Sequence, residues 1–516
     1  MILLLKILNT YIYLTHQMIF NNMNFFTCLH LFIFSIPFLL QNTTHSLNCL
    51  QNEKLALLKF KSELIDDYDR LSTWGTSNKV QQNCCKWTGV LCHNRTNHVV
   101  ALDLGGPSNV LIERYAPLRG KISSSLLELS DLSYLDLSSN DFNGTQIPDF
   151  FGFLSKLRYL NLNFTNFGGL IPQGLGNLSL SYLGLSANNF TGGIPESLGN
   201  MLSLSHFDLS LNKLEGKIPD SLGNLISISF LDFSDNQLQG EVPTFKNLSS
   251  LRFLDFSGNK FSGQASNVMN SLWNSSMLEI IDLSENFFYG SLPRIPRFRF
   301  LKELRLQSNE FNGSFVEGNL RLPSLEVLDV SGNRFSGSVP NLSLCYSLRV
   351  LNLTDNMFNG TLTQSIGYLS KLEYLGLGSN HLEGIISEPN LFNLSNLQKL
   401  DLSFNTNLTI RVASNWNPPF RLDTISLAYC ELGPRFPEWL RNQTLVQDLD
   451  ISNAKIYDTI PHWFWDNSES LLTVNMSSNK IYGVLPDLAS KLVSLTSVDL
   501  SSNELNDFRN YTEMCE

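Results

Sequence analysis

The stretch Leu132–Asn140 reads LSYLDLSSN, and this nine-residue line returns along most of the chain. It recurs as LSHFDLSLN at Leu204–Asn212 and as LTSVDLSSN at Leu495–Asn503. Its last position recurs every twenty-three to twenty-seven residues, at 140, 165, 188, 212, 236, 259, 286, 309, 333, 356, 380, 405, 430, 454, 479 and 503. Asn fills this position except at Thr165, Cys430 and Ala454. Such a regular period, without long insertions, predicts the fold almost alone.

Self-similarity at this period is the signature of leucine-rich repeats. Each coil forms one short strand and a return segment, and it buries its apolar face only by stacking on its neighbours. We therefore predict an α/β leucine-rich-repeat solenoid, a curved superhelix with a parallel β-sheet on its concave face. The solenoid is expected over residues 98–507 with about 17 coils, of which the first is degenerate at Val99, Leu102 and Leu104.

Side chains alternate between the two faces of a strand. The second and third Leu of each line should therefore point into the core, and the residues beside them should point outward. The Asn side chain is expected to bond backbone groups at the turn, and Cys is an accepted substitute there, which favours a structural role for Cys430. Ala454 and Thr165 are expected to be weaker positions.

Composition excludes several function classes. The net charge of −11 makes nucleic acid an unfavourable partner. The sequence contains no Gly-x-Ser-x-Gly elbow, no His-Glu-x-x-His pair, no phosphate loop and no protein-kinase signature. We therefore predict that the protein is not an enzyme, with no catalytic residues, no metal ligands and no cofactor. Function is expected to lie on the exposed surface of the repeats.

The two ends of the chain carry predictions about export. Residues 1–46 are interpreted as a signal peptide, because Phe25–Leu40 is almost wholly apolar and small residues follow it. An uncleaved signal anchor, or a start at Met23, is the alternative. No later stretch is long and apolar enough to predict a transmembrane helix after the repeats. We expect the secretory pathway and an extracellular or cell-surface location, and residues 508–516 form a tail without an evident cap.

Four cysteines, Cys49, Cys84, Cys85 and Cys92, lie just before the first coil, in a predicted N-terminal cap over residues 47–97. In an exported chain they indicate two disulfides with three possible connectivities. A vicinal Cys84–Cys85 bridge is strained, and we prefer Cys49–Cys84 with Cys85–Cys92. A zinc site is disfavoured by the spacing. Between these cysteines, a helix capped by Asn52 should bury one face formed by Leu57, Phe60 and Leu64.

Several segments resemble plant leucine-rich-repeat receptors. The cap segments Glu53–Phe60, Leu71–Gly75 and Cys84–Cys92 resemble the amino-terminal cap of these receptors. Gly120–Ser123 with Ser125–Leu129 narrows the resemblance to receptor-like proteins. Three further segments look like the xylanase-elicitor receptor group, EIX, of that family: Ser414–Phe420, Leu432–Leu440 and Asp458–Trp465.

This resemblance implies a long ectodomain, a membrane helix and a short tail without a kinase. Such proteins detect microbial proteins outside the cell and signal through partner kinases, so a co-receptor kinase is an expected partner. The later repeats, the island segment and the membrane helix of the family do not occur in this sequence. We therefore expect a receptor that is truncated before its membrane helix.

One row of outward strand positions is rich in rings, and aromatic side chains on an open face supply binding area at low entropic cost. The simpler explanation of this row is that aromatic residues are common at this position of such repeats. Charges interrupt it at Lys302, Glu303 and Arg305, and Gly184 and Gly376 are expected to leave space beside neighbouring rings. The candidate ligand-binding residues are Tyr134, Tyr159, Tyr182, His206, Phe230, Phe253, Arg305 and Tyr374.

A second outward row carries Asp just before the third Leu of many lines. We expect these carboxylates to be solvated, with a repulsion of about 1 kcal/mol between neighbours in water. The simpler explanation of this row is that Asp is common at this position of such repeats. The functional alternative is a surface that attracts a basic partner. The row contains Asp136, Asp208, Asp232, Asp255, Asp282, Asp329, Asp401, Asp450 and Asp499.

The tripeptide Asn-x-Ser/Thr occurs seventeen times, a density that suits a glycosylated secreted protein. Asn163, Asn352 and Asn475 lie on outward strand positions, where a glycan would shield the sheet. The predicted glycosylation sites are Asn94, Asn143, Asn177, Asn189, Asn247, Asn274, Asn312, Asn341, Asn359, Asn393, Asn407 and Asn442.

The sequence as a whole favours the ectodomain of a plant receptor-like protein that binds a microbial protein or a peptide on the concave or lateral face of its repeats. A secreted inhibitor of microbial wall-degrading enzymes is the first alternative, since such plant inhibitors share the cap and the coil type. A non-functional fragment of a disrupted receptor gene is the second.

Overall fold

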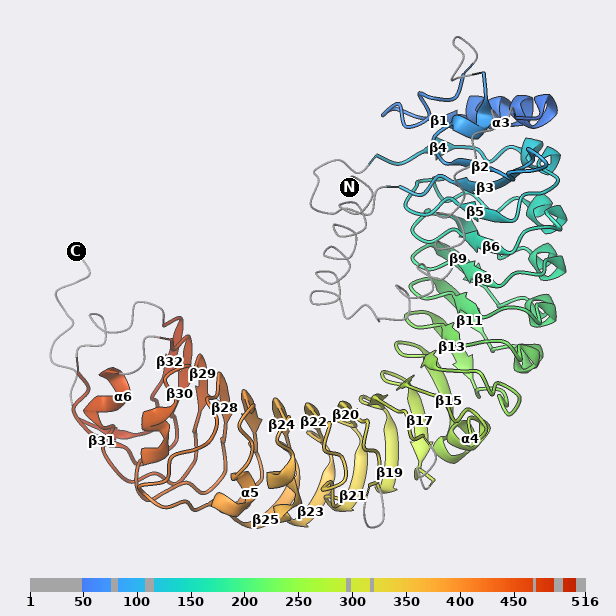
Figure 1. The fold of residues 1–516 in the computed structure, drawn as a ribbon. Coiled ribbons are helices and arrows are strands. Elements are labelled where there is room, and N and C mark those ends of the chain that lie inside the picture. The colour runs from blue at the N-terminus through green and yellow to red at the C-terminus, as the bar shows by residue number, and fades with distance from the viewer. Residues whose placement is uncertain are drawn as a thin grey trace, which may run out of the picture. The chain divides into compact units, whose positions relative to one another are not determined.

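The computed structural model describes residues 49–75, 82–106, 116–293, 298–315, 320–466, 470–486 and 495–506. The predicted signal peptide and the predicted tail lie outside these residues. The described residues belong to one compact unit, Cys49–Glu516, which is a stack of coils. Taken by itself, this unit curves so that its main sheet lines the concave side (Figure 1), as the repeat predicts.

The main sheet takes one short strand from each line of the repeat. Its first strand, β2 (Val90–Cys92), pairs antiparallel with β3 (Val99–Asp103), and every later pairing is parallel. From β3 onward the neighbours are β5 (Tyr134–Asp136), β6 (Tyr159–Asn161), β8 (Tyr182–Gly184), β10 (His206–Asp208), β12 (Phe230–Asp232), β14 (Phe253–Asp255), β16 (Ile280–Asp282), β18 (Glu303–Arg305), β20 (Val327–Asp329), β22 (Val350–Asn352), β24 (Tyr374–Gly376), β26 (Lys399–Asp401), β28 (Thr424–Ser426), β29 (Asp448–Asp450), β30 (Thr473–Asn475) and β32 (Ser497–Asp499).

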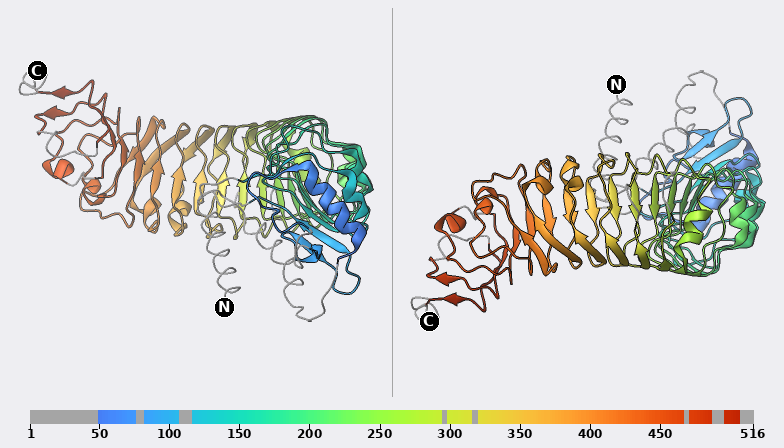
Figure 2. Two further views of the ribbon diagram at one scale, coloured as in Figure 1. Left: turned by 90° about the horizontal axis from the view of Figure 1, so that it is seen from above. Right: turned by 90° about the horizontal axis from the view of Figure 1, so that it is seen from below.

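A second parallel sheet forms in the return segments, just after the Asn position (Figure 2). The repeat predicts only an irregular return segment there. The strands of this sheet are β7 (Gly168–Gly169), β9 (Asn189–Gly192), β11 (Lys213–Gly216), β13 (Gln237–Gly240), β15 (Lys260–Gln264), β17 (Phe287–Gly290), β19 (Glu310–Ser314), β21 (Arg334–Ser338), β23 (Met357–Thr361), β25 (His381–Ile386) and β27 (Asn407–Ile410). Two short pairs join β1 (Leu64–Ile65) to β4 (Arg119–Gly120) and β31 (Tyr482–Gly483) to β33 (Glu504–Leu505).

Short helices close many of the coils. A Pro is the N-cap residue of several of them, for example Pro195 and Pro219, because its fixed φ suits an extended residue just before a helix. The helices are α3 (Gln51–Glu63), α4 (Ala265–Ser271), α5 (Glu388–Leu391), α6 (His462–Asp466), η2 (Cys84–Lys86), η3 (Ser124–Glu128), η4 (Asp149–Phe153), η5 (Gln173–Asn177), η6 (Glu196–Asn200), η7 (Asp220–Asn224), η8 (Gln364–Tyr368) and η9 (Glu438–Asn442). None of these described helices has the length and apolar character that a membrane span needs.

The Asn of each line joins its coil to the preceding coil. Asn236 is typical: its Nδ2 donates to the carbonyl of Leu209 in the preceding coil at 2.9 Å, and its Oδ1 accepts from the backbone N–H of Leu214 at 2.9 Å. At the position where Cys430 replaces Asn, its Sγ donates to the carbonyl of Leu402 at 3.0 Å. This buried thiol therefore has the structural role that the sequence predicts.

Thr165 and Ala454, the other two residues that replace Asn, form different hydrogen bonds. Thr165 donates through Oγ1 to the carbonyl of Leu162, which belongs to its own coil, at 2.7 Å. Ala454 has no side-chain donor, so the bond to the preceding coil cannot form there. Its backbone N–H still donates to Oδ1 of Asn479 at 2.9 Å. The ladder of side-chain bonds is thus interrupted at Ala454.

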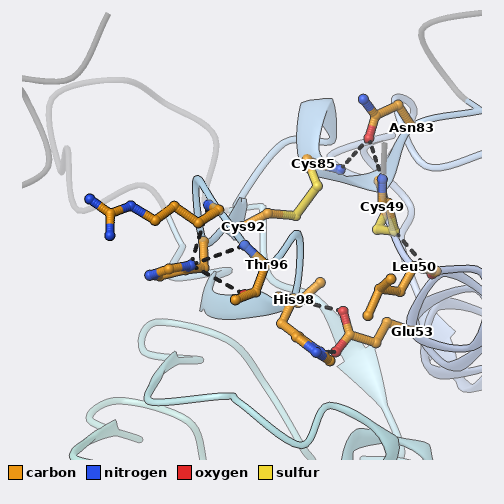
Figure 3. The surroundings of a disulfide bond; sticks show 12 residues. Cys49, Leu50, Glu53, Asn83, Cys85, Cys92, Thr96 and His98 are labelled. Atoms are coloured by element: carbon orange, nitrogen blue, oxygen red, sulfur yellow. Dashed lines mark hydrogen bonds and ion pairs between the residues drawn. A yellow bond between two sulfur atoms is a disulfide. The ribbon is translucent and has the colours of Figure 1, made fainter. Parts of the chain in front are cut away.

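The cap contains the two disulfides that the sequence predicts, Cys49–Cys84 and Cys85–Cys92 (Figure 3). Asn83 lies between them, and its Oδ1 accepts from the backbone N–H groups of Cys49 and Cys85 at 3.1 and 3.2 Å. These two bonds fix the short η2 helix against the start of the chain segment that carries α3.

Helix α3 lies across the end of the coil stack (Figure 1). Leu57 and Phe60 are buried, as predicted. Two expectations for this helix are wrong. Leu50, not Asn52, is the N-cap residue, and it makes no side-chain cap bond. Leu64 leaves the buried face because it begins β1 and pairs with Gly120 of β4.

Candidate ligand-binding surface

Each strand of the main sheet presents its first and third residues on one face, which we call the open face. In β12, the central residue Leu231 is buried in the core, whereas Phe230 and Asp232 lie on the open face. The parallel register places equivalent residues of neighbouring strands directly side by side, so Phe230 pairs with Phe253 and Asp232 with Asp255. Two continuous rows of side chains therefore run across the strands.

The first row is a stack of rings, which we call the aromatic row. Tyr134, Tyr159, Tyr182, His206, Phe230 and Phe253 follow one another with ring centroids 4.1–4.3 Å apart and planes within 15° of parallel. Ile280 continues the row after Phe253. Six of the eight candidate ligand-binding residues are thus brought together.

The stacking changes what the aromatic row offers to a ligand. The ring faces cover one another, and His206, Phe230 and Phe253 are only 3%, 9% and 8% exposed. The sequence led us to expect broad exposed rings, but a ligand meets only their edges. Burial also raises the pKa of the Tyr134, Tyr159 and Tyr182 hydroxyls, so these groups stay neutral and act as hydrogen-bonding groups.

Tyr374 stands apart from the aromatic row, because Val350 and Lys399 are its neighbours in register. Burial raises the pKa of its hydroxyl to about 12. The space expected beside it at Gly376 is already taken, since a Cβ on Gly376 would lie 2.6 Å from the Tyr374 hydroxyl oxygen. Gly184 is similar, because the side-chain amide of Asn163 lies where its Cβ would be. The glycines therefore leave no pocket beside the rings.

The second row is formed by Asp208, Asp232, Asp255 and Asp282 on adjacent strands, and we call it the carboxylate row. In each, Oδ1 accepts from both the backbone N–H and the hydroxyl of the Ser two residues later, at 2.6–3.0 Å. The sequence alone predicts solvated carboxylates with weak repulsion. The structure shows that they are largely buried between neighbouring strands.

Burial has an electrostatic consequence in the carboxylate row. Desolvation, followed by the neighbouring charge of Asp282, raises the pKa of Asp255 to about 7. Desolvation likewise raises the pKa of Asp208, of Asp232 and of Asp282. Part of this row therefore holds protons near neutral pH, and its charge changes across the weakly acidic range.

Arg305 ends the carboxylate row on the next strand. Its guanidinium lies 3.0 Å from Oε2 of Glu303 and 3.9 Å from Oδ2 of Asp282. Lys302 is engaged as well, with its Nζ 2.9 Å from Oε2 of Glu279. Lys302, Glu303 and Arg305 are thus all paired with charged side chains of their own or neighbouring coils.

The predicted glycosylation sites lie on the surface, with one partial exception. Eleven of the twelve are exposed, while Asn189 is partly buried and donates through Nδ2 to Oδ1 of Asn166 at 2.7 Å. Asn352, on the open face, donates through Nδ2 to Oδ2 of Asp329 at 3.0 Å. A glycan on Asn352 would replace one hydrogen of this amide. Glycosylation there therefore competes with the hydrogen bond to Asp329 on the open face.

Sequence reasoning missed one residue that completes the coil stack. Arg70, in the cap, donates to the carbonyls of Leu104 and Gly105 at 2.8 and 2.6 Å and to Oδ1 of Asn140 at 2.7 Å. It therefore supplies the donors that an Asn would supply in the degenerate first coil. Nothing in the repeat pattern marks it, because Arg70 lies outside the repeated line.

Comparison with known families agrees with this architecture. Residues 50–93 match the family described as leucine rich repeat N-terminal domain. Five segments match the leucine rich repeat family: 131–154, 156–178, 179–201, 203–225 and 324–344.

Similar proteins include two receptor-like proteins of Solanum lycopersicum. The chain is 44% identical to receptor-like protein EIX1 over 160 residues and 47% identical to receptor-like protein EIX2 over 129 residues. These matches cover 29% and 24% of this chain, but only 15% and 12% of the two relatives.

Among solved structures, the plant peptide hormone receptor RGFR1 in complex with RGF2 is similar, with a TM-score of 0.63 and 28% identity. That match covers 75% of this chain and 66% of the receptor chain. The Arabidopsis receptor kinase HAESA, in complex with the peptide hormone IDA and the co-receptor SERK1, has a TM-score of 0.55 and 26% identity. It is matched over 88% of this chain and 90% of its own.

Proposed function

Because this chain is a leucine-rich-repeat protein with a leucine-rich-repeat cap and is similar to plant receptor-like proteins, we propose that it is the extracellular ligand-recognition ectodomain of such a protein. Its ligand in this proposal is a microbial protein or a peptide, perceived in defence or peptide signalling. A co-receptor kinase is the proposed signalling partner, which the co-receptor SERK1 in the HAESA complex supports.

One observation carries the proposal: the aromatic row and the carboxylate row run side by side across the open face. Ring edges and hydroxyls supply apolar and polar contacts, and the adjacent carboxylates supply hydrogen-bond acceptors. A surface that combines both over several strands suits an extended polypeptide, which crosses many coils at once. Both RGFR1 and HAESA are solved with peptides bound, which supports a polypeptide ligand here.

The test is a binding panel of secreted microbial proteins and synthetic plant peptides, with a fungal xylanase included because of the resemblance to the EIX group. We expect at least one member to bind the secreted protein. Replacing Phe230 and Phe253 by Ala should weaken that binding about tenfold or more, since ring contacts at an interface are worth about 1–3 kcal/mol each.

Phe153→Ala is the matched control, because Phe153 is a 72% exposed ring on η4 and not on the open face. It should leave the affinity unchanged. A panel in which nothing binds contradicts the proposal. Equal losses in the control and in the double variant would place the ligand elsewhere.

The same panel also tests the alternative that the protein is a secreted inhibitor of microbial wall-degrading enzymes. If the bound protein is a glycanase whose hydrolysis rate falls in proportion to occupancy, direct inhibition accounts for the binding. If the glycanase remains fully active when bound, recognition without inhibition is supported. The assay needs only the purified secreted protein and a soluble substrate of the glycanase.

A further inference from the structure

The coil that leads to β28 differs from its two neighbours. The preceding coil contains α5 and the following coil contains η9, whereas residues 411–423, all of which are described, form no helix. Pro418 and Pro419 disfavour a helix there, because each lacks a backbone N–H donor and restricts the residue before it. A helix therefore covers each neighbouring coil on this side, but not this one.

A cavity of about 680 Å³ lies at this coil, between the segments that lead to β26, β28 and β29. Its apolar lining includes Leu445, which is 55% exposed. Side-chain amides, a guanidinium and exposed carbon together suit a sugar ring, which has hydroxyls at its rim and C–H groups on its faces. The polar lining is formed by Ser395, Asn396, Gln398, Asn417, Arg421 and Asp423.

The wall of this cavity is held in place by Gln443, which is buried directly after η9. Its Oε1 accepts from the backbone N–H of Leu422 at 2.9 Å, and its Nε2 donates to the carbonyl of Phe420 at 3.3 Å. Nη1 of Arg421 donates to the same carbonyl at 2.9 Å. Within the described part of the chain, Nε and Nη2 of Arg421 form no hydrogen bond, so this guanidinium can still donate to an oxygen in the cavity.

Asn442 lies at the rim of the cavity. It is the exposed last residue of η9, and the sequence Asn442-Gln443-Thr444 makes it one of the predicted glycosylation sites. Its Nδ2 is the atom to which a glycan is attached. This atom donates to Oδ1 of Asn417 in the cavity lining at 3.0 Å. A glycan on Asn442 therefore begins at the cavity wall, with its first sugars within reach of the lining.

We propose that the N-glycan of Asn442 occupies this cavity with its first sugars and takes the place of the missing helix. Sugar hydroxyl and acetamido groups bond the side-chain amide of Asn396 and the guanidinium of Arg421, and one sugar face packs on Leu445. The glycan thereby holds residues 411–423 against the coil of η9. The edge of the coils from β26 to β29 becomes a glycan-covered surface that is closed to protein partners.

Asn177 is a matched site for comparison. It is the exposed last residue of η5, and Asn177-Leu178-Ser179 is also a predicted glycosylation site. The coil before it contains η4, on the side where the coil before Asn442 has no helix. A glycan on Asn177 is therefore expected to extend into solvent.

The test uses the full chain secreted from cultured eukaryotic cells, which attach N-glycans. The native protein is treated with a peptide N-glycosidase, and mass spectrometry follows the release of glycan from Asn442 and from Asn177. We expect release from Asn442 to be at least about tenfold slower than release from Asn177, because its first sugars are held by hydrogen bonds and covered by the cavity. After unfolding, the two rates should be equal.

Three variants separate the cavity from other causes. Leu445→Ser removes the apolar contact but keeps the glycosylation sequence, and it should raise the release rate at Asn442 toward that at Asn177. Thr444→Ala removes the Asn442 glycan, and hydrogen exchange of residues 411–423 should become at least about tenfold faster. Ser179→Ala is the matched control, and it should leave the exchange of η4 and η5 unchanged. Thr444 and Ser179 are both exposed, so neither change disturbs the core.

A secreted protein without a glycan on Asn442 overturns the proposal. So do equal release rates at Asn442 and Asn177 in the native protein, which would leave the cavity open to another occupant. Slow release that persists in Leu445→Ser, or exchange of residues 411–423 that is unchanged in Thr444→Ala, also overturns it. The comparison of the two sites in the wild type decides the matter even if a variant is not secreted.

Discussion

Asn236 shows how one side chain can hold two coils together. Buried backbone groups at the turn need partners, and this amide supplies a donor to the Leu209 carbonyl and an acceptor to the Leu214 N–H, both in the preceding coil. The same arrangement recurs along the stack, with a thiol as donor at Cys430. Each such residue therefore contributes to the interface between coils and not only to its own turn.

Replacing Asn236 by Ala should lower the free energy of unfolding by about 2–4 kcal/mol, because the Leu209 carbonyl and the Leu214 N–H lose buried bonds. The measurement is urea unfolding followed by circular dichroism. Gln237→Ala, at the exposed next residue, should change stability by less than about 0.5 kcal/mol. Equal effects would refute the ladder as a major source of stability.

Asp255 makes a second prediction, about pH. Its pKa is raised from 3.8 to about 7, so between these values the folded protein holds a proton that the unfolded chain releases. Stability should therefore fall as pH rises from about 4 to 7, by an amount on the order of a few kcal/mol for the carboxylate row. Asp255→Asn should flatten this slope, as Asn161 and Asn352 already occupy equivalent positions.

Protein made without N-glycans is needed for that comparison, because Asp255→Asn creates the sequence Asn-Phe-Ser. Asp499→Asn is the control, since Asp499 is exposed and its pKa is lowered, chiefly by a hydrogen bond from Ser501. Thermal unfolding at pH 4.5, 6 and 7.5 measures the slope. An unchanged slope in Asp255→Asn would mean that the row is ionised throughout.

At the scale of elements, the cap is tied to the first coil by one buried carboxylate. Glu53 of α3 is fully buried, and its two oxygens accept from Nδ1 of His98 at 2.8 Å and from the backbone N–H of Val99 at 2.8 Å (Figure 3). The bond to Glu53 raises the pKa of His98. Helix α3 and strand β3 are thereby joined across the end of the core.

This link should weaken as pH rises, in the same direction as the carboxylate row but over a more alkaline range. His98 has a raised pKa, so its contribution is complete below its ordinary value of 6.5 and is lost as pH rises through the folded value. His98→Gln should therefore destabilise the cap more at pH 5.5 than at pH 8.5, by about 1 kcal/mol. Hydrogen exchange of α3 amides measures the effect, and an equal loss at both pH values would contradict it.

The sequence predicts an element well where a single local pattern is enough to specify it. Strands such as β12 follow from the period of Leu and Asn, and the cap disulfides follow from four clustered cysteines in an exported chain. The second sheet could not be predicted, because its strands form only when return segments of neighbouring coils align. The same holds for burial of Asp255, which depends on rings and carboxylates of adjacent coils that no single line contains.

The candidate site shows a similar division. The alternation of side chains along a strand is enough to predict that Tyr182 and Phe230 lie on the open face, and the structure places them there. Their stacking through His206 needs the exact register between coils, which is a property of the sheet.

At the scale of the whole molecule, we propose that the open face binds a polypeptide. Along this face, the carboxylate row offers a simple way to block access. In each of its lines Asp is followed two residues later by Ser, so a single Asp→Asn change creates a glycosylation site on the open face. Glycans are large, and one in the middle of the row should exclude a ligand that spans several coils.

The most direct test is therefore the affinity of glycosylated Asp255→Asn for the panel protein that the wild type binds most tightly. Asp255→Asn with Ser257→Ala, which carries no glycan there, separates the glycan from the substitution. Glu128→Asn, which places a glycan at the end of η3 as Asn177 would at the end of η5, controls for an added glycan elsewhere. We expect affinity to fall by at least about a hundredfold only in glycosylated Asp255→Asn. Undiminished binding by that variant, at full glycan occupancy, would contradict it.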